Sequence, residues 1–75
     1  MSERDLEKVS EIRNLALKGK ARQIRERSRL SLRDMAEVVG VNHSSLSRWE
    51  TGESMPRPAA ALRWARILRR LDGAS

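Results

Sequence analysis

Cysteine, tyrosine and phenylalanine are absent from this 75-residue sequence, which contains one histidine and two tryptophans. The lack of cysteine excludes disulfides and thiolate zinc sites, and one histidine cannot build a metal centre by itself. No apolar run approaches the roughly 18 residues of a membrane span, and no signal-peptide pattern is seen. One domain of this size buries only about 60% of its unfolded surface. Because neither disulfides nor a metal can stabilise it, its core must come from helix packing, with or without dimerisation.

Positive charge is in excess, because 16 lysines and arginines against 10 acidic residues give a net charge of +6. The excess is local: residues 20–33 contain six basic side chains against one acidic one, whereas residues 1–19 contain four of each. Such a balance favours a polyanionic partner, most commonly nucleic acid. Arginine-rich helices can also be simple solvated faces, and charge alone does not separate the two interpretations.

The stretch at residues 31–52, SLRDMAEVVGVNHSSLSRWETG, predicts two short helices joined by a tight turn. Ser31 is a good N-cap, and Asp34 three residues later gives the acidic form of the capping box. Gly40 is suited to end the first helix, because glycine adopts the left-handed conformation without a Cβ penalty. The apolar positions of this helix recur at helical spacing and share one face: Leu32, Met35, Ala36 and Val39.

The second of these helices is predicted to begin after Asn42, which can cap it, and to end at Gly52. Leu46 and Trp49 are three residues apart, so one side of this helix should face the core. We assign Trp49 to the core rather than to stacking on bases, because an intercalating tryptophan would leave the helix unpacked. The opposite side offers hydrogen-bonding residues with little reason to be buried: His43, Ser44, Ser47 and Arg48.

Two short helices with a glycine-containing turn are a helix-turn-helix signature. Residues 24–52, IRERSRLSLRDMAEVVGVNHSSLSRWETG, followed by Pro56, resemble the lambda-repressor-like family of phage and bacterial regulators of the Cro, C1 and XRE type. The shared features are an arginine in the first helix, a serine-led second helix, and a glutamate and glycine after the third. The resemblance covers about residues 20–71 and implies an all-α fold, a compact bundle of four to five short helices with a central helix-turn-helix.

The remaining segments are predicted to be helical as well. Residues 20–75 should form the helix-turn-helix domain, with a first helix at about 21–28 and a last helix from Pro58 to about Leu71. Residues 1–19 should form an extra N-terminal helix, from about residue 3 to 17, with an apolar stripe. The Lys18–Gly19–Lys20 step either breaks that helix or lets it continue. This helix could pack on the domain, form a dimer contact or bind a second protein.

The last helix has apolar residues on more than one face, so part of its surface must be covered. The N-terminal helix or a second copy of the chain could do so. The residues of this predicted dimer or partner contact are Trp64, Ile67 and Leu71.

The resemblance also implies site residues. Arg25 would pair with Glu50 and tie the first helix of the domain to the third, although Arg25 could instead contact phosphate. The usual base-reading positions of the family correspond to His43, Ser44 and Arg48. Ser47 lies on the same polar side of the helix at 43–50, and we assign it to base reading with them. Caps and flanking residues are expected to bind DNA phosphates: Ser31, Arg33, Asn42, Ser45 and Arg57.

The expected function is a sequence-specific, double-stranded DNA-binding transcriptional regulator of the Cro-like or repressor type, cytoplasmic and nucleoid-associated. We expect a homodimer on an inverted-repeat operator, with no cofactor, metal, membrane or small-molecule ligand. The alternative is an antitoxin-like module that binds a partner protein through apolar stripes on its first and last helices. An enzyme is not expected, because no plausible catalytic cluster is present. RNA binding would lack a platform of stacking aromatics.

Overall fold

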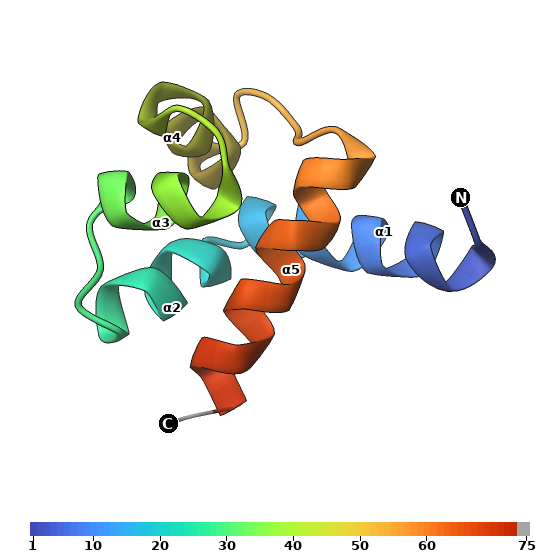
Figure 1. Cartoon of the computed structure of the whole chain (residues 1–75), viewed down its shortest axis with the longest axis horizontal. Coiled ribbons are helices and arrows are strands. Elements are labelled where there is room, and N and C mark those ends of the chain that lie inside the picture. Colours follow the sequence, from blue (N-terminus) through green and yellow to red (C-terminus); the bar gives the residue numbers. More distant parts are fainter. Residues whose placement is uncertain (74–75) are drawn as a thin grey trace.

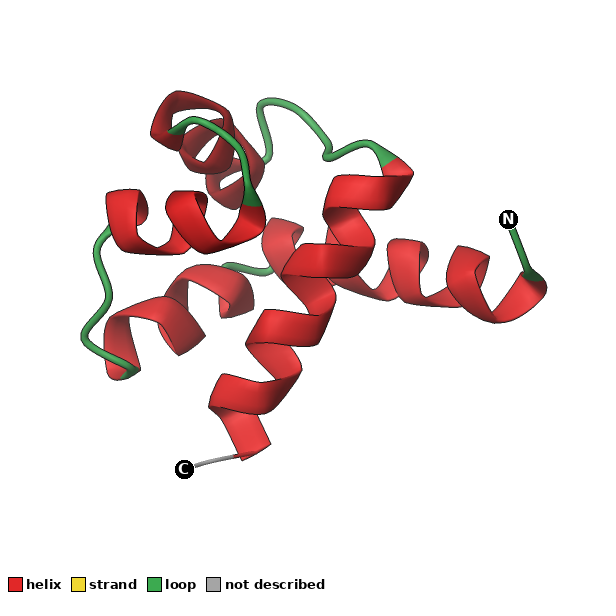
Figure 2. Cartoon of the chain, viewed as in Figure 1, coloured by secondary structure: helices red, strands yellow, loops and turns green. Residues whose placement is uncertain are grey.

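The computed structural model describes residues 1–73 and is entirely helical in its regular structure over that range (Figures 1 and 2). The predicted all-α fold, with a central helix-turn-helix and an extra N-terminal helix, is confirmed. The helices of the described residues are α1 (Glu3–Leu17), α2 (Lys20–Arg27), α3 (Leu32–Val39), α4 (His43–Thr51) and α5 (Pro58–Gly73).

Local sequence explains where α1 begins and ends. The Ser2 hydroxyl accepts a hydrogen bond from the Asp5 N–H at 3.1 Å, which satisfies one of the free donors of the first turn. Gly19 has a φ of +77°, a conformation that side chains with a Cβ rarely adopt. The chain therefore breaks at Gly19, and α2 starts at Lys20 as a separate helix.

The core lies where α1 and α5 pack against each other, and α5 crosses in front of α1 in Figure 1. α1 contributes buried Val9, Ile12 and Ala16, and α5 contributes Trp64 and Leu68. The sequence predicted that either the N-terminal helix or a second copy of the chain would cover part of the last helix. In the structure, α1 packs on α5 within the same chain. Burial of such apolar area is worth about 25 cal/mol per Å², so α1 is a structural part of the core.

This packing corrects one residue of the predicted partner contact. Trp64 has no exposed surface in the folded chain, so it has no area left to offer to a partner. Ile67 and Leu71 are partly buried and pack at the edge of the core. Trp64 is thus a core residue, because the core covers more of the circumference of α5 than the pattern alone predicted.

Two further properties concern only residues 1–73. None of the helices there combines the length and the apolar character needed to cross a bilayer. No group of three or more His, Cys, Asp or Glu side chains in that range is arranged to hold a metal ion.

Candidate nucleic-acid interface

The helix-turn-helix consists of α3, α4 and the turn between them, and the two helices pack against each other. Gly40 has a φ of +84° and ends α3. The N–H groups of Gly40 and Val41 both donate to the carbonyl of Ala36, at 2.8 and 3.0 Å. A left-handed residue at this position satisfies the last carbonyls of a helix and turns the chain sharply. The direction of α4 relative to α3 is therefore set by the backbone of this turn.

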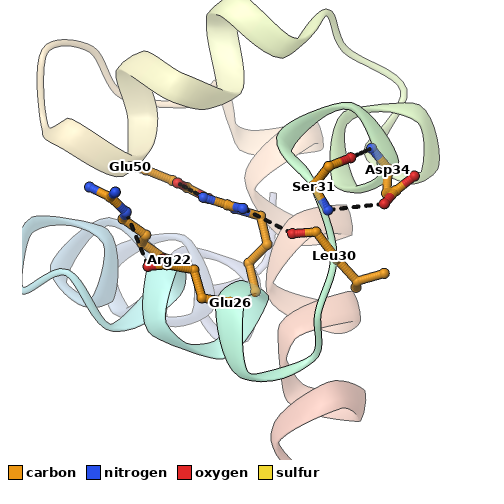
Figure 3. A network of polar contacts seen from close by, with 7 residues as sticks. Arg22, Glu26, Leu30, Ser31, Asp34 and Glu50 are labelled. Atoms are coloured by element: carbon orange, nitrogen blue, oxygen red, sulfur yellow. Dashed lines mark hydrogen bonds and ion pairs between the residues drawn. The ribbon is translucent and has the colours of Figure 1, made fainter.

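The N-termini of α3 and α4 are capped by side chains. At α3, the Ser31 hydroxyl accepts from the Asp34 N–H at 3.0 Å, and the Ser31 N–H donates to the Asp34 carboxylate at 2.9 Å (Figure 3). At α4, Asn42 Oδ1 accepts from the Ser45 N–H at 2.9 Å. The predicted capping box and the Asn42 cap are both confirmed. These caps at the N-termini of α3 and α4 define where each helix begins.

The capping box makes the stability of the fold sensitive to acid. The pKa of Asp34 lies below its ordinary value, chiefly because the Ser31 backbone N–H donates to the carboxylate and secondly because of the Ser31 side chain. A carboxyl group with a lowered folded-state pKa stabilises the fold above its unfolded-state pKa, and the effect is lost as pH falls through the folded-state value. We expect Asp34→Asn to lower the melting temperature at neutral pH and to flatten its decline below about pH 4. Thermal denaturation followed by circular dichroism across this range checks it; equal pH slopes in both proteins would contradict it.

The two sides of α4 differ in burial as predicted. Leu46 has no exposed surface and Trp49 is 7% exposed. On the other side His43, Ser44 and Arg48 are exposed and Ser47 is half-buried. The described chain thus leaves the polar side of α4 open to solvent, so a large ligand can reach it.

Trp49 is held by a second tryptophan. The ring centroids of Trp49 and Trp64 are 5.5 Å apart and the ring planes are tilted by 45°. Tilted aromatic pairs at this distance are favourable beyond the area that they bury. Because Trp64 belongs to α5, the pair anchors α4 to the core that α1 and α5 form.

A buried ion pair ties α4 to α2. Arg25 donates from Nε and Nη2 to the two carboxylate oxygens of Glu50, at 2.7 and 3.0 Å. Its Nη1 donates to the Leu30 carbonyl at 2.9 Å, and the Glu50 and Leu30 ends of this network are visible in Figure 3. The pKa of Arg25 is raised above its ordinary value, mainly by the hydrogen bonds to Glu50. All three donor nitrogens of Arg25 face internal acceptors, which argues against the alternative phosphate role.

The residues expected to contact phosphate lie at the beginnings of three helices. Ser31 and Asn42 are exposed caps, and Arg33 is exposed in the first turn of α3. Ser45 is half-buried in the first turn of α4, and Arg57 is exposed immediately before α5. Helix N-termini present unpaired N–H groups and a partial positive charge, which suits phosphate.

The sequence did not reveal two arginines that position these elements. Arg63 of α5 donates from Nε to the Val39 carbonyl at 2.8 Å, at the end of α3. Arg13 of α1 donates from Nη2 to the Pro56 carbonyl at 2.9 Å, in the loop after α4. Their partners are 24 and 43 residues away in the chain, so no local pattern could indicate them.

Two short capped helices, packed on each other across a glycine turn, define a helix-turn-helix protein. Comparison with known families agrees: a model of a helix-turn-helix domain matches residues 19–74. The chain belongs to this family, consistent with its resemblance to Cro- and XRE-type regulators. Searches among curated proteins and among solved structures each gave no significant match.

Proposed function

We propose that this protein is a sequence-specific transcriptional regulator that reads double-stranded DNA with α4. Membership of the helix-turn-helix family supports DNA binding in general. The observation that favours α4 as the base-reading element is its orientation, with Leu46 and Trp49 packed inward and the opposite side uncovered. An α-helix fits the major groove, where each base pair presents a distinct pattern of donors and acceptors.

Base reading is assigned to the polar side of α4: His43, Ser44, Ser47 and Arg48. Arg48 can donate bidentately to O6 and N7 of guanine, which is the commonest specific contact in the major groove. His43 can donate to or accept from purine edges, and it lies in the first turn of α4, where such readers are usually placed. The serines are short and contact any base, so most of the discrimination should come from Arg48.

Phosphate binding is assigned to the helix caps and flanking residues, which are exposed except for the half-buried Ser45: Ser31, Arg33, Asn42, Ser45 and Arg57. These contacts set the position of the protein on the duplex, and they respond strongly to salt because bound counterions are released. The net charge of +6 supports this role.

Alanine substitution separates the two kinds of contact. We expect Arg48→Ala to lose about 1–3 kcal/mol of discrimination between the preferred duplex and a random one. Arg57→Ala should weaken binding to both duplexes about equally and lower the slope of affinity against salt by about 0.9. Electrophoretic titration at several salt concentrations measures both quantities, with a preferred duplex obtained by selection from a random library. If Arg48→Ala keeps the specificity ratio of the wild type, the base-reading role of Arg48 is wrong.

The proposed assembly is a homodimer on an inverted repeat, with half-sites about 34 Å apart, one turn of the duplex. One apolar surface available for a contact is a groove between α3 and α5, to which Ile67 and Leu71 contribute. Leu30 and Val38 line the same groove, and Val38 is 66% exposed.

The same groove favours a second candidate, a module that binds a partner protein in the manner of an antitoxin. Exposed apolar surface of this kind marks contact sites in soluble proteins. The oligomeric state, measured by sedimentation, distinguishes the two candidates. A dimer formed through this groove would cover Val38, whereas a monomer leaves the groove open for another protein.

A further inference from the structure

The N-terminal helix α1 contacts the elements on which the proposed interface depends, although it precedes the family match. The match begins at residue 19, whereas α1 ends at Leu17. α1 packs against α4 as well as against α2 and α5. It also reaches the loop of residues 52–57, which joins α4 to α5 and ends with Arg57.

Arg13 holds the second half of this loop. Its Nη2 donates to the carbonyl oxygen of Pro56 at 2.9 Å, and Pro56 is fully buried. A loop carbonyl in the interior needs a donor, because no helix supplies one. Arg13 Nε is buried and makes no hydrogen bond to the described residues, a cost that an apolar side chain would avoid. The contribution of the guanidinium is therefore the contact with Pro56, one residue before Arg57.

Leu17 supports the beginning of the same loop. Gly52 has a φ of +81°, and the Leu17 Cδ2 atom lies 3.0 Å from the point where a Cβ on Gly52 would stand. The next residue, Glu53, donates its N–H to the carbonyl of Arg48 at 2.9 Å. The loop thus starts against α1 and is bonded to the backbone of a proposed base-reading residue.

We propose that α1 acts as a brace, meaning that its contacts hold the loop of residues 52–57 in place beside the DNA-binding surface. Within this brace, Arg13 is a positioning residue for Arg57. Neither α1 nor Arg13 touches DNA in this proposal, which rests on the proposed function. A loop that is ordered before binding loses less conformational freedom in the complex, so affinity increases without any new contact. The brace acts on affinity for all duplexes, since it positions a phosphate contact rather than a base contact.

A double-mutant cycle between Arg13 and Arg57 tests the brace. Arg13→Met removes the hydrogen bond and keeps an apolar stem of similar length. We expect it to weaken binding to the preferred and random duplexes about three- to tenfold, and to lower the salt slope by about 0.9, as Arg57→Ala does. In the double variant the losses of affinity should not add, because Arg57→Ala has already removed the phosphate contact that Arg13 positions. Arg13→Lys keeps a donor for the Pro56 carbonyl and should recover part of the affinity.

The matched control is Arg4→Met, which removes the same charge from an exposed position of α1. Its effect should be small and should add to that of Arg57→Ala. Circular dichroism of each variant establishes whether it folds. If Arg13→Met unfolds, Leu17→Ala takes its place in the cycle, because it truncates an exposed side chain, and it should show the same non-additivity with Arg57→Ala. Additive losses for both Arg13→Met and Leu17→Ala would overturn the brace while leaving DNA binding intact. A wild-type protein that selects no duplex would instead overturn the proposed function.

Discussion

Replacing Arg25 by methionine is expected to destabilise the fold by about 3–5 kcal/mol, because it leaves the Glu50 carboxylate buried without its counter-charge. The side chains of Arg25 and Glu50 are only 11% and 4% exposed. Arg25 also donates to the Leu30 carbonyl, so the corner between α2 and α3 loses a hydrogen bond as well. Urea denaturation followed by circular dichroism measures the change.

The matched control for this prediction lies on the same helix. Arg22 pairs with Glu26 at 3.1 Å, but these side chains are 59% and 56% exposed. Solvent screens such a pair, so Arg22→Met should cost less than about 1 kcal/mol. An equal cost for both arginines would contradict the distinction between the buried and the exposed pair.

A second substitution isolates the cause. Adding Glu50→Leu to Arg25→Met removes the orphaned charge, and a buried ion pair replaced by apolar residues is often tolerated. The double variant should therefore be more stable than Arg25→Met alone. If Arg25 were instead a phosphate contact, Arg25→Met would keep its stability and lose DNA affinity.

Truncating Trp64 to alanine is expected to cost about 3–5 kcal/mol, the range for large-to-small changes of a fully buried aromatic residue. Trp64 has no exposed surface, and its ring faces Trp49 at a centroid distance of 5.5 Å. The cavity would lie beneath α4, so that helix loses its aromatic anchor. Small domains have stabilities near the low end of about 5–15 kcal/mol, so much of the variant should be unfolded at 37 °C.

Urea denaturation followed by circular dichroism also checks this prediction. Trp64→Phe keeps an aromatic ring opposite Trp49 and should cost clearly less than Trp64→Ala. Leu71→Ala serves as a control, because Leu71 is only partly buried at the end of α5 and truncation should leave a smaller cavity. A Trp64→Ala protein with unchanged stability and weakened self-association would restore the partner-contact interpretation of this residue.

The helix boundaries of the helix-turn-helix were predictable because their causes are local. The capping residues Ser31 and Asn42 bond to N–H groups three residues away. Gly40 and Gly52 take left-handed conformations that other residues rarely adopt. The inward orientation of Leu46 and Trp49 follows from helical spacing alone.

The contact between Arg25 and Glu50 could be expected for a different reason. Nothing in the spacing of two residues 25 positions apart indicates that they meet. The expectation came from the resemblance to Cro- and XRE-type regulators, and the structure shows the bidentate pair. Its burial and the third hydrogen bond to the Leu30 carbonyl were not predicted.

The sequence by itself therefore determined the class of fold, the ends of α3 and α4 and the side of α4 that faces solvent, because caps, glycines and apolar spacing act over a few residues. Only the tertiary structure decided that Trp64 is fully buried where α5 packs on α1 and α4, that Arg63 bonds the end of α3 and that Arg13 reaches the loop before Arg57. These contacts join residues far apart in the chain. Whether such residues meet depends on how whole helices pack, and the periodicity of one helix does not specify its neighbours.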